Sequence, residues 1–334
     1  MLAGSGPSRD QAAEYFAVRQ SVGLVDRSDL GVLEVTGRDR AAFLHAMLSN
    51  DIKALGPGQG CRAAFLDVHG KVQALLIVWA LDDRILVLTP AGGAGALAEA
   101  LDKYLFSEKA YLRDATGEQA LLWLAGPEAV ALAQRLTGSV PGESAWSQVA
   151  TSLDGVEVRL VRGSGETGEA EVGIVGPAGQ RDRLQARLAE AGARPVGAQA
   201  WEALRIEGGT PLYGRDVDAS VLLPEIPLES LVSHTKGCYL GQEVVVRVRD
   251  RGHVNRHLRG FTLDGEVLPI PGAVVEVAGA ESGRLTSAAW SFGLKRPVAL
   301  GFVRRQHAEP GTAVVVRSGE SSMPGVVTGL PLPR

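Results

Sequence analysis

The chain has 334 residues, of which 45% are apolar and 22% charged, and its formal net charge is −4 at pH 7. This composition is typical of a globular protein with two or three domains, and the mild acidity excludes binding of nucleic acid through overall charge. Cys61 and Cys238 are too few for a disulfide framework or for an ordinary iron–sulfur cluster.

The N-terminal sequence and the apolar runs predict a protein without a membrane anchor. Residues 1–16 lack the basic start and the apolar core of a signal peptide. The longest apolar run, residues 74–81, is far shorter than the ~20 residues that cross a bilayer. With so few cysteines, these features predict a cytoplasmic, reduced protein that has no membrane partner.

The first third of the sequence alternates helical and strand patterns. Ser8 can cap a helix, and apolar side chains recur at helical spacing around Phe43 and Leu44. His69 and Gly70 stand between two apolar runs and predict a tight hairpin turn. The predicted elements are a helix at 10–20, a strand at 32–36, a helix at 38–49, strands at 61–68, 72–80 and 84–89, and a helix at 96–106.

From residue 119 the pattern starts again, between loops that are rich in glycine and serine. Its β-α-β-β-α order is typical of a separate ferredoxin-like layer, so we expect this stretch to form its own domain. The predicted elements are a strand at 119–125, a helix at 127–136, strands at 156–162 and 170–175, and a helix at 178–191.

The last part begins with a helix at 197–207 and a passage rich in proline and glycine at 208–227. After residue 259 only short runs with strand chemistry follow, and proline and glycine separate them. This punctuation is typical of a small barrel or sandwich. The runs are 260–263, 273–278, 283–290, 298–304, 312–317 and 325–328.

Cys238 stands in the most unusual stretch of the sequence, residues 236–260. Glycines lie on both sides of it, at Gly237 and Gly241, and Lys236 precedes it. A thiolate is stabilised by nearby cations, so this stretch predicts a reactive cysteine with Lys236 as its activating partner. The arginines that follow are Arg247, Arg249, Arg251, Arg256 and Arg259.

These arginines admit two geometries. In a strand, Arg247, Arg249 and Arg251 share one face, and the valines before them favour this conformation. In a helix, Glu243, Arg247 and Arg251 stack one turn apart, with an ion pair between the first two. Either arrangement can also be a solvated charged face. We expect no metal site nearby, because His253 and His257 have no further ligand at useful spacing.

Three groups of residues carry a resemblance to a known family. The stretch around Cys238 resembles the signature of the YgfZ family, folate-binding proteins that support assembly or repair of iron–sulfur clusters. Residues 204–209 with Pro211 are similar to the pterin-contacting segment of that family and of the aminomethyltransferase of the glycine cleavage system. Residues 23–26 and 49–52 also resemble that superfamily. The signature residues are Lys236, Gly237, Cys238, Tyr239, Gly241, Gln242, Glu243, Arg247, Arg251 and Gly252.

The resemblance implies an α+β fold with three domains in a ring around a central folate site, closed by a small C-terminal β-barrel. The folate-binding domain is then discontinuous, comprising residues 1–115 and 197–250. Residues 116–196 form the ferredoxin-like domain, and residues 251–334 form the barrel domain.

The resemblance also implies a cofactor, tetrahydrofolate, and the residues that hold it. Glu207 is expected to hydrogen-bond the pterin, within a segment that includes Arg205. The segment after Gln242 is expected to be a helix, so that Arg247 and Arg251 project together toward the glutamate tail of folate or an acidic partner. The implied cofactor contacts are Arg205, Glu207, Gln242, Glu243, Arg247 and Arg251.

One departure from the aminomethyltransferases decides the expected reaction. Their paired aspartates, aligned through Gly70, fall here at Ala74 and Leu75, which can neither hold a cationic amine nor move a proton. We therefore expect a monomeric tetrahydrofolate-binding protein, not an ordinary enzyme, that uses Cys238 to support iron–sulfur clusters in carrier or client proteins.

Two alternatives stay open at this point. The first is a folate-dependent aminomethyl or one-carbon transferase, for which Asp67 is the candidate acid. The second is an accessory protein that contacts RNA through the arginine-rich stretch, although the acidity of the chain makes a nucleic-acid partner the weaker expectation.

Overall fold

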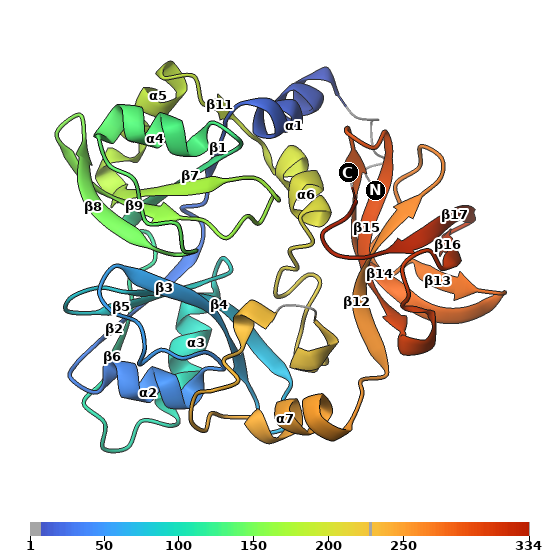
Figure 1. Ribbon diagram of the computed structural model, residues 1–334, viewed down its shortest axis with the longest axis horizontal. Helices are drawn as coiled ribbons and strands as arrows, with labels where there is room; N and C mark the ends of the chain where they lie inside the picture. Colours follow the sequence, from blue (N-terminus) through green and yellow to red (C-terminus); the bar gives the residue numbers. More distant parts are fainter. Residues whose placement is uncertain (1–7, 227–228, 334) are drawn as a thin grey trace.

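The computed structural model describes residues 8–226 and 229–333. Within them, three sheets are arranged in a ring (Figure 1). One sheet has the strand order β11-β1-β7-β10-β9-β8, the second has the order β3-β4-β5-β2-β6, and the C-terminal part closes into a barrel. The predicted fold class, an α+β ring with a C-terminal barrel, is confirmed.

The five-stranded sheet is antiparallel, and helices α2 and α3 pack on one of its faces. Gly70 has a left-handed conformation (φ +75°) between β3 and β4, which confirms the predicted hairpin turn. The other face packs on the six-stranded sheet, where the rings of Trp79 and Trp123 stack 6.3 Å apart. The elements are β2 (Gly31–Thr36), α2 (Arg40–Met47), β3 (Gln59–Leu66), β4 (Val72–Ala80), β5 (Ile85–Thr89), α3 (Gly93–Asp102) and β6 (Tyr111–Asp114).

The six-stranded sheet contains three strands that the sequence patterns did not predict, namely β1, β8 and the two-residue β11. β1 pairs with β7, so a piece of the N-terminal part joins this sheet. β8 pairs with β9, but three of its six residues are polar and only Leu153 is buried, so its apolar pattern is weak. These pairings do not define domain limits, so the domain boundaries stay a prediction. The elements are β1 (Gly23–Asp26), β7 (Gln119–Ala125), α4 (Ala129–Thr137), β8 (Gln148–Leu153), β9 (Val156–Arg162), β10 (Glu171–Pro177), α5 (Arg181–Glu190) and β11 (Arg194–Pro195).

Helices α1 (Arg9–Gln20) and α6 (Ala198–Glu207) lie between the six-stranded sheet and the barrel (Figure 1). Ser8 caps α1 in a reciprocal pair with Gln11, as the sequence predicts. The barrel strands coincide with the six predicted runs. They are β12 (Arg256–Leu263), β13 (Val274–Val277), β14 (Ala280–Ser291), β15 (Arg296–Arg304), β16 (Ala313–Ser318) and β17 (Ser321–Thr328). Among the described residues, none of the helices has the length and apolar character needed to cross a bilayer.

Candidate functional site

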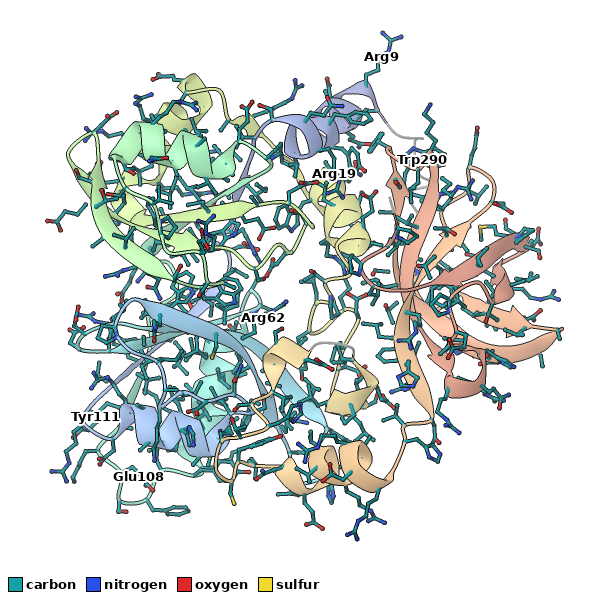
Figure 2. All side chains as sticks on the ribbon, in the orientation of Figure 1. Arg9, Arg19, Arg62, Glu108, Tyr111 and Trp290 are labelled. Atoms are coloured by element: carbon teal, nitrogen blue, oxygen red, sulfur yellow. The ribbon has the colours of Figure 1, made fainter. Side chains whose placement is uncertain are left out.

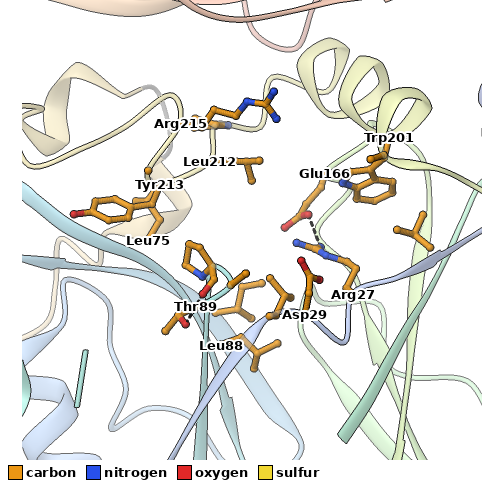
Figure 3. A pocket seen from close by; sticks show the side chains of 18 of the residues that line it. Arg27, Asp29, Leu75, Leu88, Thr89, Glu166, Trp201, Leu212, Tyr213 and Arg215 are labelled. Carbon is orange, nitrogen blue, oxygen red and sulfur yellow. Dashed lines mark hydrogen bonds and ion pairs between the residues drawn. The ribbon is translucent and has the colours of Figure 1, made fainter. Parts of the chain in front are cut away.

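A cavity of about 540 Å³ lies at the centre of the ring (Figure 3). Its apolar wall comes from strands β4 and β5, where Leu75, Ile77 and Leu88 face inward. Trp201, near the start of α6, and Tyr213, in the loop after α6, add two aromatic side chains. This volume and this mixture of apolar and polar walls are typical of a small-molecule site.

An ion pair between Arg27 and Glu166 is the polar centre of this cavity. The Arg27 guanidinium donates to the Glu166 carboxylate at 2.7 Å, and only 12% and 4% of the two side chains are exposed. The guanidinium carbon lies 5.7 Å from the Trp123 ring and 5.6 Å from the Trp201 ring. Cation–π contact with the two indoles therefore holds Arg27 in place, and Arg27 in turn holds Glu166.

A second cavity of about 400 Å³ adjoins the first, because Arg62 and Glu166 line both. The two side chains approach to 3.9 Å, close enough for attraction but too far for a hydrogen bond. Trp146 and Cys61 form part of the remaining wall, together with glycines and hydroxyl residues. Burial, with a smaller effect of the Asp51 charge, raises the pKa of the Cys61 thiol to about 12, so this cysteine stays protonated.

Glu166, in the loop before β10, and Glu171, the first residue of β10, are two buried carboxylates that influence each other's charge. Burial disfavours the charged form of Glu166, but Arg27 and Arg62 outweigh it and hold its pKa below the usual value. Burial and then the negative charge of Glu166 raise the pKa of Glu171 to about 7. Sequence patterns did not predict Arg27, Arg62 or the two glutamates as site residues.

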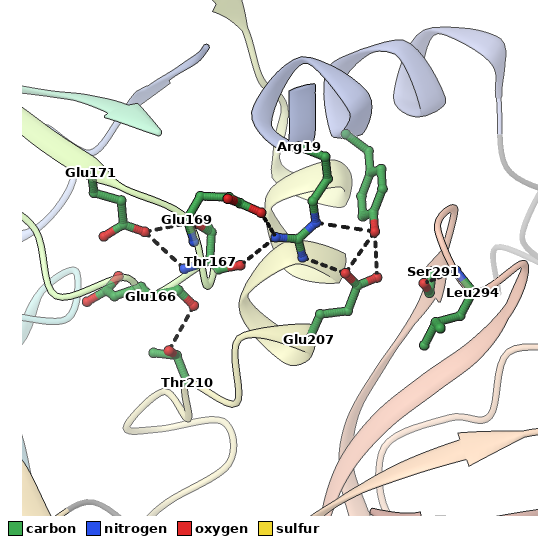
Figure 4. Close-up of polar contacts among 10 residues, drawn as sticks. Arg19, Glu166, Thr167, Glu169, Glu171, Glu207, Thr210, Ser291 and Leu294 are labelled. Atoms are coloured by element: carbon green, nitrogen blue, oxygen red, sulfur yellow. Dashed lines mark hydrogen bonds and ion pairs between the residues drawn. The ribbon is translucent and has the colours of Figure 1, made fainter. Parts of the chain in front are cut away.

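Glu207, the predicted pterin contact, lies in a different cluster (Figure 4). The Tyr15 hydroxyl donates to its two carboxylate oxygens at 2.8 and 3.1 Å, and Arg19 donates at 2.5 Å. The carboxylate thus faces α1, and the described walls of both cavities are formed by other residues. In this position Glu207 joins helices α1 and α6, while its role as a pterin contact stays a prediction.

Arg205, on the same helix, is fully buried and has its own partners. Its guanidinium donates to Asp216 at 2.7 Å and to Glu202 at 2.5 Å. Asp216 also accepts hydrogen bonds of 2.6 Å from Thr286 and Ser287, which belong to the barrel strand β14. Arg205 therefore fixes the loop after α6 against the barrel.

Cys238 is exposed, in the turn that precedes helix α7 (Gln242–Arg251). This turn lies on the β3–β4 hairpin. Gly241 is left-handed (φ +78°), and a Cβ atom there would stand 2.3 Å from the Asp67 carbonyl oxygen. A Cβ atom on Gly70 would likewise stand 2.8 Å from Val244. These glycines are thus required by close packing of the chain on itself.

Lys236 points into the protein. Its ammonium group donates to backbone carbonyls of His45, Leu48 and Asn50, the last two at 2.6 and 3.1 Å. These carbonyls lie at the end of α2, so Lys236 anchors the cysteine turn there. Burial lowers the pKa of Lys236 to about 8. Activation of the Cys238 thiol by this lysine stays a prediction.

Helix α7 is present as the resemblance implies, and the strand that the valines favour is not formed. Only Val245 is buried, and Gln242 accepts a hydrogen bond from the backbone N–H of Tyr239 at 3.3 Å. Glu243, Arg247 and Arg251 are exposed. The structure therefore places the predicted cofactor contacts in three separate regions, namely the Glu207 cluster, the Arg205 cluster and the surface of α7.

The three sheets and the helices beside them define a protein of the α+β class, with a ligand-sized cavity between the two open sheets and α6. The model of the GCVT N-terminal domain matches residues 7–236, and that of the glycine cleavage T-protein C-terminal barrel domain matches residues 256–332. The chain therefore belongs to the glycine cleavage T-protein family.

Named relatives are similar over nearly the whole chain. An aminomethyltransferase of Streptomyces avermitilis is 32% identical over 98% of this chain and 90% of its own length. A chloroplastic protein of Arabidopsis thaliana that is named as a transferase is 30% identical over 99% of this chain and 77% of its own length. The glycine cleavage system aminomethyltransferase T of Bartonella henselae has a similar structure, with a TM-score of 0.85 and 26% identity, covering 96% of this chain and 89% of that one.

Proposed function

We propose that this chain binds tetrahydrofolate in the central cavity and lacks the amine-transfer step of the aminomethyltransferases. The observation that carries the proposal is the β4 wall. Strand alternation directs Leu75 and Ile77 into the cavity and packs Ala74 in the core beside α2 and α3. The position that faces the ligand is therefore a leucine, which can neither bind a cationic amine nor accept its proton.

The residues of the central cavity fit a reduced pterin. Trp201 and Tyr213 supply aromatic faces, and the leucines supply an apolar wall that excludes water. Glu166 is a carboxylate held charged by Arg27, and such a group can accept hydrogen bonds from the donor edge of a pterin. Tetrahydrofolate, when bound, would supply ring and side-chain nitrogens that can accept a one-carbon unit.

The second part of the proposal assigns the working thiol to Cys238. Its support is the resemblance to the YgfZ signature and the exposed position of Cys238 on a turn that Lys236 anchors. An exposed thiol can release its proton to water and, as a thiolate, ligate an iron of a client's cluster transiently, without owning a cluster. The partners are then cytoplasmic iron–sulfur carriers or client enzymes, and the chain acts as a monomer.

The test of the thiol is complementation in a strain that lacks this protein. The readout is the activity of a cluster-dependent enzyme, with Cys238→Ser and the matched control Cys61→Ser expressed at equal levels. We expect Cys61→Ser to restore activity and Cys238→Ser to fail. Full restoration by Cys238→Ser contradicts the thiol role.

A one-carbon transferase is the second candidate, supported by the aminomethyltransferase relatives and by Asp29, an acid on the cavity wall (Figure 3). Asp67, the acid expected from sequence, instead accepts hydrogen bonds from the backbone N–H groups of His69 and Lys71 in the hairpin turn, at 2.9 Å each. Formation of methylene-tetrahydrofolate from an aminomethyl donor, lost in Asp29→Asn, favours this candidate over the first.

A further inference from the structure

Arg62 lies where the two central cavities meet, and its side chain is only partly used. It projects from β3 toward the centre of the ring (Figure 2). Only 12% of the side chain is exposed, and its one ion pair among the described residues is the 3.9 Å contact with Glu166. A guanidinium has several N–H donors in one plane, and because Arg62 lines both cavities these donors are accessible to a ligand there.

The charge around Arg62 favours an anion. Glu166 already accepts a 2.7 Å hydrogen bond from Arg27, so two guanidinium groups share one carboxylate. In the smaller cavity, Arg62 and Glu166 are the charged residues among the described wall residues. Counted together with Arg27 in the adjoining cavity, these groups carry one excess positive charge where the two cavities meet, in contrast to the aspartate pair of the aminomethyltransferases.

The rest of the smaller cavity suits a small planar group. Ser164, Ser230 and Thr210 contribute hydroxyl-bearing side chains to its wall, and Trp146 contributes an apolar face. Gly208 brings the backbone close, because a Cβ atom there would stand 2.1 Å from the Glu166 carbonyl oxygen. A carboxylate matches this environment, since arginine binds it through two parallel hydrogen bonds.

We propose that Arg62 holds a carboxylate group in the smaller cavity, beside the ligand of the larger one. The carboxylate has two sources. It belongs either to the glutamate tail of folate, in which case the inference rests on the proposed function, or to a separate small carboxylic acid. Both sources place the same chemical group on the same guanidinium.

The experiment is titration calorimetry of the full chain with tetrahydrofolate, 6-methyltetrahydropterin and succinate. The variants are Arg62→Gln, Arg62→Lys and the control Arg135→Gln, which removes an exposed arginine of α4. If the glutamate tail is the source, Arg62→Gln lowers the affinity for tetrahydrofolate about 10-fold to 100-fold. The affinity for 6-methyltetrahydropterin, which has no glutamate, stays unchanged. If a separate acid is the source, Arg62→Gln lowers the affinity for succinate by the same factor and leaves the affinity for tetrahydrofolate unchanged.

In both cases Arg62→Lys gives an intermediate loss, because it keeps the charge and loses the paired geometry. Unchanged binding of both tetrahydrofolate and succinate in Arg62→Gln overturns the inference, provided that its circular dichroism spectrum matches the wild type. Failure of the wild type to bind any folate refutes the proposed function alone, because succinate still tests Arg62.

Discussion

Two buried arginine–glutamate clusters meet at the loop between β9 and β10, and they differ in how completely their hydrogen bonds are formed. In the first, the Arg19 guanidinium donates to Glu207, to Glu169 and to the carbonyl of Thr167, so its donors are taken up (Figure 4). In the second, Arg62 has a 3.9 Å contact with Glu166 and faces two cavities. The first cluster is a structural joint and the second has the chemistry of a binding site.

The comparison shows that burial of a charged side chain does not by itself identify a binding site. Both glutamates are buried carboxylates beside an arginine, so burial and charge alone do not distinguish them. The distinguishing features are donors that are left over and a cavity for them to face. By this criterion we propose Arg27, Arg62 and Glu166 as the ligand contacts.

The largest expected effect on stability comes from replacing Arg19, whose hydrogen bonds join α1 to Glu207 on α6. Arg19→Met leaves the Glu207 carboxylate buried without its cation, and removing one partner of a buried pair costs about 3–5 kcal/mol. The urea midpoint of unfolding is therefore expected to fall strongly. Arg9→Met is the matched control, because Arg9 is exposed at the start of the same helix. A loss of free energy of unfolding below about 1 kcal/mol, which is the range of exposed ion pairs, contradicts a structural role for the Arg19–Glu207 pair.

The second expected effect is a pH dependence of the free energy of unfolding, on the order of a few kcal/mol, from Glu171. Its folded pKa of about 7 exceeds the ordinary 4.5, so its contribution to stability is complete below pH 4.5 and is lost as pH rises through 7. Glu171→Gln has no carboxyl group to titrate, so its free energy of unfolding does not carry this pH dependence. The difference in free energy of unfolding between wild type and variant therefore changes between pH 4.5 and pH 7. Glu157→Gln, at an exposed position of β9, serves as control. Parallel pH curves for wild type and Glu171→Gln rule out the raised pKa.

The smallest expected change is in the stability of Arg62→Gln. Because Arg62 makes no hydrogen bond to Glu166, its removal is expected to alter the free energy of unfolding by less than about 1 kcal/mol. Urea unfolding beside Arg19→Met measures the contrast directly. A loss as large as that of Arg19→Met shows that the second cluster is also a joint.

Local patterns predicted most of the fold. Alternating apolar residues bounded by proline and glycine predicted the six barrel strands, and Ser8 predicted the start of α1. β8 was missed because half of its residues are polar and only Leu153 is buried, although it pairs along its whole length with β9. The valines of α7 favoured a strand, but the turn at Gly241 opens a helix that rests on the hairpin.

The cavity could not be predicted in the same way. Arg27, Arg62, Glu166 and Trp201 come from four distant parts of the chain, and only the ring brings them together. Glu207 matched a pattern, but the pattern did not show that its side chain turns toward α1. A sequence motif identifies a helix more readily than the direction in which one of its side chains points.

Tetrahydrofolate titration of Trp201→Ala and Glu207→Gln compares the two regions in one assay. If the ligand lies in the central cavity, Trp201→Ala weakens binding about 10-fold or more, because an aromatic wall is lost, and folded Glu207→Gln stays near the wild type. The reverse result, normal affinity in Trp201→Ala and lost affinity in Glu207→Gln, contradicts the assignment and returns the pterin to Glu207.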